Sequence, residues 1–195
     1  MITEDDRGWM REALELAGRG SALASPNPVV GAVVLDAAGD KAGEGFHRYA
    51  AVAHAEALAL EQAGERAKGG TLYVTLEPCS HQGRTAPCVD AVIAAGIKRV
   101  VCPLEDESPK VSGAGFRRLH EAGIEVDIMD ELSGLARRLN EDFFHYAKTG
   151  LPLVTLKTAA TLDGKISPRT ITRAGSRPRS RAATCKPCGT VTTPS

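Results

Sequence analysis

Thr71-Leu72-Tyr73-Val74-Thr75-Leu76-Glu77-Pro78-Cys79 is the stretch that decides the fold of this chain. Its first six residues are apolar, aromatic or β-branched, and this composition predicts a buried strand. The strand leads into Cys79, and a loop of eight residues then reaches Cys88, where we expect a helix over residues 88–95 to begin. The stretch therefore predicts a strand–loop–helix unit that carries one cysteine at each end of the loop.

The alternation of strand and helix continues on both sides of this unit. The predicted helices cover residues 4–19, 54–67, 88–95, 113–122 and 130–147, and the predicted strands cover residues 29–35, 41–46, 71–76, 98–102 and 124–129. Such alternation indicates an α/β domain with a largely parallel sheet. The first two strands are joined by a short turn and read as an antiparallel hairpin, so we expect a mixed, mostly parallel, five-stranded sheet.

Charge is distributed unevenly along the 195 residues, although the chain as a whole has no net charge. Residues 168–195 contain six Lys or Arg and no Asp or Glu, which leaves residues 1–167 with a net charge of −6. The chain also has only eight Phe, Tyr and Trp residues. A nucleic-acid-binding protein would combine a basic face with aromatic platforms, so the main body is not expected to bind nucleic acid.

Nothing in the sequence predicts a membrane protein or a secreted one. No run of 18 apolar residues occurs. The first residues are acidic, whereas a signal peptide begins with basic residues that are followed by an apolar run. The five cysteines are an odd number, which favours thiolate chemistry in a reducing compartment over a set of disulfides. We expect a cytoplasmic protein.

His54, Cys79 and Cys88 are candidate ligands of one Zn²⁺ ion. One imidazole and two thiolates suit zinc, and three protein ligands leave a fourth position open, as a catalytic zinc requires. Glu56 lies two residues from His54, where its carboxylate could serve as the catalytic proton shuttle for metal-bound water of lowered pKa. The alternatives are a structural zinc, which would normally have a fourth Cys or His nearby, and ordinary buried cysteines.

The pattern His-x-Glu followed by Pro-Cys and a second Cys is the signature of the zinc-dependent deaminases. Within that group the chain resembles the deaminase domain of the bacterial bifunctional riboflavin-biosynthesis deaminase/reductases over roughly residues 5–147. The matching stretches are Ser25–Gly31, Gly43–His47, His54-Ala55-Glu56, Glu77–Cys88 and Gly96–Val100. The long spacing between the two cysteines carries most weight, because nucleoside, cytosine and tRNA deaminases generally place two residues there.

This resemblance implies a cytidine-deaminase-like, three-layer α-β-α fold and a hydrolytic reaction. The implied substrate is 2,5-diamino-6-ribosylamino-4(3H)-pyrimidinone 5′-phosphate, converted to its 5-aminouracil analogue and ammonia by zinc-activated water. The implied substrate-binding residues are Asn27, His47, His81, Arg84, Asp106 and Ser108. Asn27 can donate to and accept from a pyrimidine edge, and the donor fork of Arg84 suits a phosphate. The alternatives are a turn residue for Asn27, a solvated cation for Arg84 and a structural histidine for His47.

Several positions depart from the family pattern without touching the zinc ligands. Ser108 replaces the usual longer Asn, Ala51 stands where a glycine is usual, and Ala57-Leu58 replaces the commoner pair after Glu56. These departures affect the expected substrate contacts and affinity rather than the expected reaction.

Residues 148–167 resemble the linker and first strand of a reductase domain, with an apolar strand predicted over residues 150–166. The resemblance ends at Ser167, so NADPH-dependent reduction is not expected. Residues 168–195 are basic, have no periodicity and are expected to be disordered. An out-of-frame or truncated reading frame is the favoured explanation of this tail, and a genuine short tail is the alternative. The pair Cys185 and Cys188 is an isolated C-x₂-C, which is weak evidence of a metal site.

Two other functions remain open at this point. The chain could deaminate another small base or nucleotide, or it could be a non-catalytic remnant that binds a separate reductase. The resemblance also implies a homo-oligomer and a small-molecule substrate.

Overall fold

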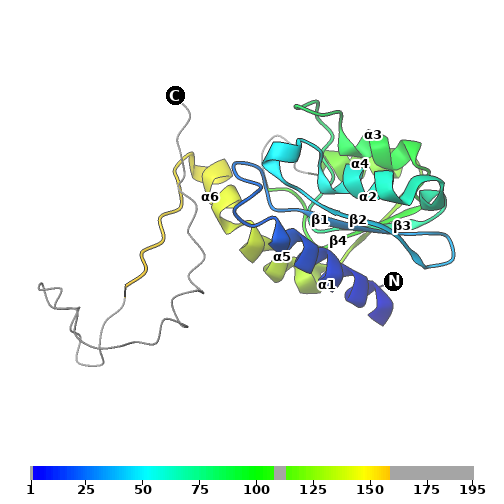
Figure 1. The fold of residues 1–195 in the computed structure, drawn as a ribbon, viewed down its shortest axis with the longest axis horizontal. Coiled ribbons are helices and arrows are strands. Elements are labelled where there is room, and N and C mark those ends of the chain that lie inside the picture. Colours follow the sequence, from blue (N-terminus) through cyan, green and yellow to red (C-terminus); the bar gives the residue numbers. More distant parts are fainter. Residues whose placement is uncertain (1, 108–112, 159–195) are drawn as a thin grey trace, which may run out of the picture. The chain divides into compact units, whose positions relative to one another are not determined.

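The structure is a computed structural model that describes residues 2–107 and 113–158. Residues up to Pro152 form one unit, and a second unit begins at Leu153. The first unit has three layers, with a five-stranded sheet between two layers of helices (Figure 1). This arrangement confirms the predicted α/β class.

The sheet has the strand order β2-β1-β3-β4-β5. The strands are β1 (Gly31–Leu35), β2 (Lys41–Phe46), β3 (Thr71–Val74), β4 (Arg99–Cys102) and β5 (Glu125–Ile128). β1 is antiparallel to both of its neighbours, β2 and β3, whereas β3, β4 and β5 pair in parallel. β1 alone therefore runs against the other four strands, and the predicted mixed sheet with an initial antiparallel hairpin is confirmed.

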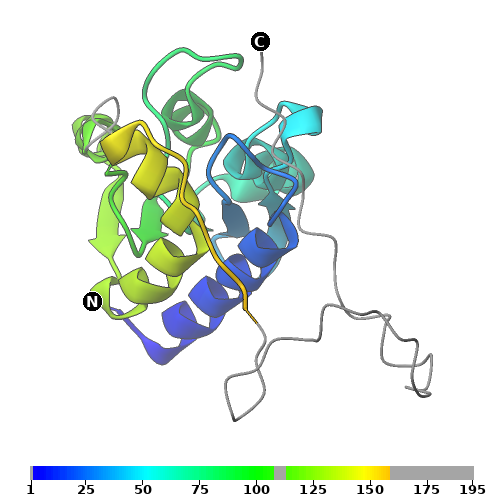
Figure 2. The same ribbon diagram turned by 90° about the vertical axis from the view of Figure 1, so that its left-hand side faces the viewer.

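Helices cover both faces of the sheet (Figures 1 and 2). One face carries α1 (Glu4–Arg19) and α5 (Ser133–Leu139), and the other carries α2 (Ala55–Ala63), α3 (Cys88–Ala94) and α4 (Ala114–Glu121). The last helix, α6 (Glu141–Thr149), follows α5. Three short 3₁₀ helices are η1 (Tyr49–Ala51), η2 (Gly64–Ala67) and η3 (Asp130–Leu132). No helix in the described ranges is long and apolar enough to cross a membrane.

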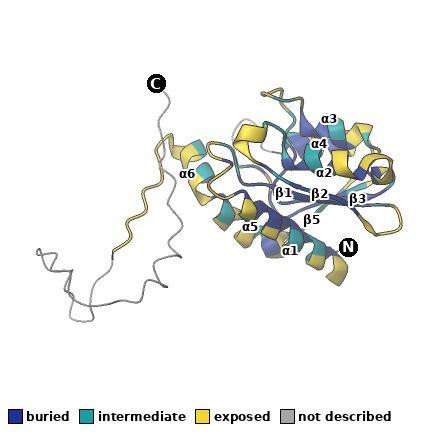
Figure 3. Ribbon diagram, in the orientation of Figure 1, coloured by how far each residue is buried: buried dark blue, intermediate teal, exposed yellow. Residues whose placement is uncertain are grey.

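The central strands β1, β3 and β4 are buried, whereas the edge strand β5 and the outer sides of the helices are partly exposed (Figure 3). α1 shows why these residues form a helix. Thr3 accepts a hydrogen bond from the Asp6 backbone N–H at 3.1 Å and donates its own N–H to the Asp6 carboxylate at 2.7 Å, so a capping box closes the N-terminus. The apolar side of the helix, including Met10 and Leu16, is buried against the sheet.

Two glycines in β2 fix how closely α2 lies on the sheet. A Cβ atom on Gly43 would lie 2.1 Å from the Ala59 carbonyl oxygen, and one on Gly45 would lie 2.5 Å from the Ala55 carbonyl oxygen. Only glycine permits this approach, because the atoms in the way belong to the helix backbone. The close packing determines the position of the first turn of α2, which follows His54 directly.

The predicted helix over residues 130–147 is wrong in one respect, because it is interrupted. η3 and α5 end before Asn140, whose φ of −116° and ψ of 23° are not helical, and α6 begins after it. The buried Asn140 amide accepts a hydrogen bond from the Val29 N–H at 2.7 Å and donates one to the Val29 C=O at 3.0 Å. These bonds to a distant segment hold Asn140 out of the helical conformation.

Two further predicted elements differ from the structure. The helix predicted over residues 54–67 stops at Ala63, because Gly64 adopts a positive φ of 54° and a 3₁₀ turn follows. The strand predicted over residues 150–166 is wrong for its described part, since residues 151–158 form no strand. A strand needs a partner, and no neighbouring strand pairs with these described residues. The rest of that strand and the tail over residues 168–195, including Cys185 and Cys188, lie outside the described residues.

Candidate active site

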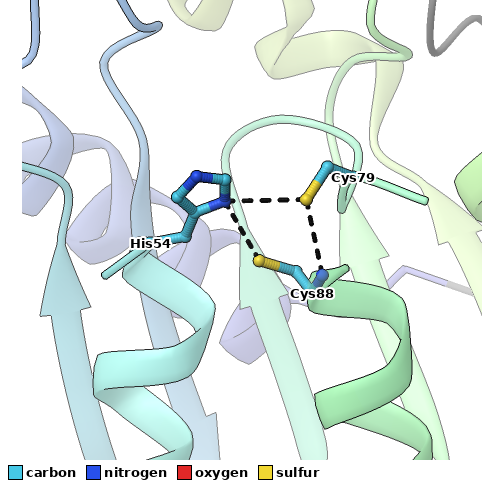
Figure 4. A group of neighbouring side chains, drawn as sticks. All are labelled: His54, Cys79 and Cys88. Atoms are coloured by element: carbon cyan, nitrogen blue, oxygen red, sulfur yellow. Dashed lines mark hydrogen bonds between the residues drawn. The ribbon is translucent and has the colours of Figure 1, made fainter. Parts of the chain in front are cut away.

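Three different elements bring the predicted zinc ligands together (Figure 4). His54 is the residue before the first turn of α2, and Cys88 is the first residue of α3. Cys79 lies in the loop that leaves β3 at its carboxyl end. The side chains of all three converge on one point, as the positions of the motifs in the sequence predicted.

The spacing of the ligand atoms fits a zinc ion. His54 Nδ1 lies 3.2 Å from Cys88 Sγ and 3.6 Å from Cys79 Sγ, and all three atoms lie within 4.8 Å of one another. Tetrahedral zinc with its usual bonds to nitrogen and sulfur keeps such atoms about 3.6–3.8 Å apart. Nitrogen and sulfur are also the ligand types that zinc prefers, so the residues present fit the metal.

Charge at the site favours metal binding as well. The Cys88 thiol and the His54 ring lower the pKa of Cys79 to about 4, because both donate hydrogen bonds that favour the thiolate. Cys88 holds the proton that its partner lacks, which raises its own pKa. A metal ion that displaces this proton would convert the second thiol to a thiolate ligand.

Glu56 lies in the first turn of α2 and lines the same cavity as His54 and Cys79. Its side chain is buried, and burial together with the negative charge of Cys79 raises the pKa of Glu56 to about 7. A carboxyl group in such surroundings can hold a proton or release it near neutral pH, as a proton shuttle must.

A cavity of about 570 Å³ opens over these residues. Five of the six predicted substrate-binding residues line it, namely Asn27, His47, His81, Arg84 and Asp106. The sixth, Ser108, lies outside the described residues. A cavity of this volume, with polar groups above a metal site, is large enough for a small ligand.

A short hydrogen-bond chain orients one wall of the cavity. His47 Nδ1 lies 2.9 Å from the Ala53 carbonyl oxygen, which only accepts, so we assign the proton to Nδ1. His47 Nε2 is then the acceptor for the Asn27 Nδ2–H at 3.0 Å. Burial also lowers the pKa of His47, which favours the neutral ring. The Asn27 amide uses one N–H in this contact, so His47 fixes the orientation of the amide.

Glu77 supports the part of the cavity wall that carries Asp106, and the sequence had not singled it out for this purpose. Its buried carboxylate accepts hydrogen bonds from four backbone N–H groups. One of these donors is Asp106, and the other three lie at or near the start of α4. Glu77 thereby ties the loop that carries Asp106 to the strand end that carries Cys79.

Sequence reasoning also missed other residues that line the cavity, among them Tyr49, Val52, Phe143 and Tyr146. Phe143 and Tyr146 are three residues apart on α6 and share one face of that helix, a spacing that could have indicated them. Val52 has a φ of 65°, and the Ala53 N–H bonds to the Ala51 carbonyl at 2.7 Å across it. A β-branched residue rarely adopts this tight turn, so nothing in one sequence predicts it.

A family model described as the cytidine and deoxycytidylate deaminase zinc-binding region matches residues 3–104. The chain belongs to this family. The match includes His54, Glu56, Cys79 and Cys88 and extends just past β4. The recognition of a zinc-binding deaminase domain from the signature residues is therefore confirmed.

Riboflavin-biosynthesis proteins are prominent among its similar proteins. The riboflavin biosynthesis protein RibD of Aquifex aeolicus is 53% identical over 167 residues, which are 86% of this chain and 46% of the relative. A solved structure of Acinetobacter baumannii RibD is 49% identical, with a TM-score of 0.77, over 82% of this chain and 44% of that one. The chain thus spans less than half the length of these relatives and shares the fold of their deaminase-like part.

A third comparison is the crystal structure of a diaminohydroxyphosphoribosylaminopyrimidine deaminase/5-amino-6-(5-phosphoribosylamino)uracil reductase from Thermotoga maritima. It is 47% identical with a TM-score of 0.76, and the match covers 82% of this chain and 46% of that one. The resemblance to the bifunctional riboflavin-biosynthesis family, drawn from the motifs, is confirmed.

Proposed function

We propose that this chain catalyses the hydrolytic deamination of 2,5-diamino-6-ribosylamino-4(3H)-pyrimidinone 5′-phosphate to 5-amino-6-ribosylaminouracil 5′-phosphate. The observation that carries the proposal is the cavity itself. A three-ligand zinc site and a buried carboxyl group lie together in a space large enough for a pyrimidine ribonucleotide, and a guanidinium lines the same space. The name of the Thermotoga relative supplies the substrate class.

The reaction replaces the amino group on C2 of the pyrimidine by oxygen. One water molecule adds to C2, and the bond from C2 to its exocyclic amino nitrogen breaks. Ammonia leaves with one proton of the water, and the adjacent ring nitrogen takes the other. His54, Cys79 and Cys88 would hold a zinc ion, which would supply a Lewis acid that lowers the pKa of a water molecule. The remaining requirements fall on the side chains around it.

Glu56 is proposed to move the protons. Its carboxylate takes a proton from the attacking water and delivers a proton to the departing amino group. Burial favours the neutral form of this carboxyl group and raises its pKa, which helps it to keep the proton that it has taken until the amino group departs. Burial also excludes bulk water from the carboxyl group.

The other cavity residues are proposed to bind and orient the substrate. Asn27, held by His47, presents an amide oxygen that can accept a hydrogen bond from a pyrimidine N–H. Asp106 is buried in the cavity wall and can accept from ribose hydroxyls or ring N–H groups. Arg84 is the one permanently cationic residue among the described residues that line the cavity, which suits it to the phosphate.

Ammonia release from the zinc-loaded full chain tests this function. We expect turnover with the riboflavin precursor and none with cytosine, cytidine or dCMP. The control is Glu56→Gln, which should retain one zinc per chain and lose ammonia release. Turnover of a different base would assign another substrate, near-normal turnover by Glu56→Gln would remove the proposed shuttle, and full zinc occupancy without turnover would favour a binding protein.

We infer further that residues 1–147 suffice for this reaction and that residues 148–167 and 168–195 are not needed for it. The chain is also proposed to act in the cytoplasm as a homo-oligomer, with a separate reductase using NADPH on its product. Light scattering of the purified chain tests the oligomer. Ammonia release by residues 1–152, the unit that contains every described residue of the cavity, tests whether the residues after Pro152 are needed.

A further inference from the structure

Tyr49 lies at the start of the 3₁₀ helix η1, at the edge of the cavity. Its backbone is fixed by a hydrogen bond from its N–H to the Leu23 carbonyl at 2.9 Å. Its ring lies under the guanidinium of Arg84, with Arg84 Cζ 4.8 Å from the ring centroid. This distance is within the range of a cation–π interaction.

Among the residues that the structure describes, the loop over residues 80–87, which carries Arg84, forms few hydrogen bonds to other elements. Gly83 N–H and the Gln82 side chain both bond to the Thr85 carbonyl, so these bonds stay within the loop. Arg118 reaches the loop only at its first residue, through the Ser80 carbonyl at 3.2 Å. At the tip, the contact of Arg84 with the Tyr49 ring ties the loop to another part of the fold.

The stacking leaves Arg84 available for an anion. An aromatic ring contacts the face of a guanidinium, whereas phosphate oxygens bind its N–H donors along the edge. Arg84 forms no ion pair with the described carboxylates, in contrast to Arg66, Arg99 and Arg118. The ring thus restricts the rotamers of a long, flexible cation without neutralising its charge.

We propose that Tyr49 is a positioning residue that holds Arg84 over the mouth of the cavity for the phosphate of the substrate. The inference rests on the proposed function, because it takes the substrate to be a phosphate ester. It predicts that Tyr49 contributes to recognition of the phosphate and not to recognition of the pyrimidine ring. Tyr49 acts through Arg84, so its contribution disappears when the guanidinium is absent.

Binding to the zinc-loaded Glu56→Gln chain, which holds the substrate without turning it over, measures this effect directly. The two ligands are the substrate and its dephosphorylated ribonucleoside, compared by calorimetry. In this background Tyr49→Leu should weaken binding of the phosphorylated ligand roughly two- to fivefold and leave the dephosphorylated ligand unchanged. Tyr49→Phe, which keeps the ring, should restore binding of the phosphorylated ligand.

Two further variants separate positioning from loss of fold. Tyr146 lines the same cavity from α6 and is not stacked on Arg84, so Tyr146→Leu should affect both ligands alike. When Arg84 is replaced by Gln, Tyr49→Leu should cause no additional loss. An equal loss for both ligands with Tyr49→Leu, or a further loss in the Arg84→Gln background, would overturn the inference.

The same data distinguish failure of the inference from failure of the proposed function. If the Glu56→Gln chain prefers the phosphorylated ligand and the added Tyr49→Leu preserves that preference, only the role of Tyr49 is wrong. If the Glu56→Gln chain binds neither ligand, or binds both equally, the proposed substrate is wrong and the proposed role of Tyr49 is wrong as well.

Discussion

At the scale of single residues, Glu77 shows how a buried charge can organise a site without entering it. Glu77 Oε2 accepts from the N–H groups of Asp106 at 3.1 Å and Gly113 at 2.9 Å, and Oε1 accepts from Gly115 at 2.7 Å and Phe116 at 3.4 Å. Several of these donors belong to the start of α4, where a negative charge is favoured. In all four of these hydrogen bonds the donor is a backbone N–H group.

Glu77→Gln tests this arrangement. The new amide group brings N–H donors towards backbone N–H groups, so at least one buried donor loses its partner. We expect the free energy of unfolding to fall by about 2 kcal/mol and the KM to rise through displacement of Asp106. Urea denaturation and steady-state kinetics measure the two effects. Glu61→Gln, on the exposed side of α2, is the matched control and should change neither quantity.

Asn140 joins two segments that both contribute to the cavity. Its amide pairs with both backbone groups of Val29, two residues after Asn27, and α6 with Phe143 and Tyr146 starts at the next residue. Asn140→Asp keeps the shape of the side chain and removes the donor to the Val29 carbonyl. We expect a loss of about 2–3 kcal/mol in the free energy of unfolding. Gln82→Glu, a similar change on the exposed loop, should cost little, and equal losses in the two variants would show that Asn140 has no special role.

At the scale of elements, the position of α2 on β2 determines the position of His54 and Glu56. A methyl group on Gly45 would lie 2.5 Å from the Ala55 carbonyl and 2.8 Å from Leu58 Cβ, so α2 must move to admit it. We expect Gly45→Ala to lower both the melting temperature and the zinc content after purification. Gly18→Ala in α1 meets nothing within 4 Å and should raise stability by up to about 1 kcal/mol through helix propensity. A stable, zinc-replete Gly45→Ala chain would contradict this account.

The limits of sequence-based prediction are clearest at the same scale. Strand and helix positions around Cys79 and Cys88 were predictable, because apolar strands and the ligand motif are local patterns. The break at Asn140 was not, since it depends on hydrogen bonds to Val29, 111 residues away. The turn at Val52 was likewise hidden, because a positive φ at a valine opposes local preference and is imposed by its surroundings. Pairwise contacts such as Arg84 on Tyr49 need the folded chain.

At the scale of the whole unit, a charged network joins α1 to three strands beneath the sheet. The Asp6 carboxylate accepts hydrogen bonds from Arg99 at 2.7 and 3.2 Å and from the Tyr73 hydroxyl at 2.6 Å. Arg99 also binds Asp127 on β5 at 2.6 Å. Burial by itself would raise the pKa of Asp6, but the hydrogen bonds from Arg99, Tyr73 and Thr3 outweigh it and lower the pKa well below its usual range.

This lowered pKa makes the stability contributed by Asp6 dependent on pH in a definite direction. An aspartate side chain in the unfolded chain has a pKa of about 3.9. The stabilisation is therefore complete above that pH and is lost as the pH falls towards the lower pKa of Asp6 in the folded chain. Asp6→Asn should reduce the free energy of unfolding at pH 7 by about 2 kcal/mol, because Arg99 and the Tyr73 hydroxyl lose their shared carboxylate partner while Arg99 keeps its bond to Asp127. The difference in the free energy of unfolding between Asp6→Asn and the unmodified chain should narrow steadily as urea denaturation is repeated from pH 4 down to pH 2.

The control is Asp5→Asn, in the same helical turn but exposed, which should differ little from the unmodified chain in its free energy of unfolding at every pH. A gap for Asp6→Asn that stayed constant down to pH 2 would mean that the network does not hold the carboxylate in its charged form.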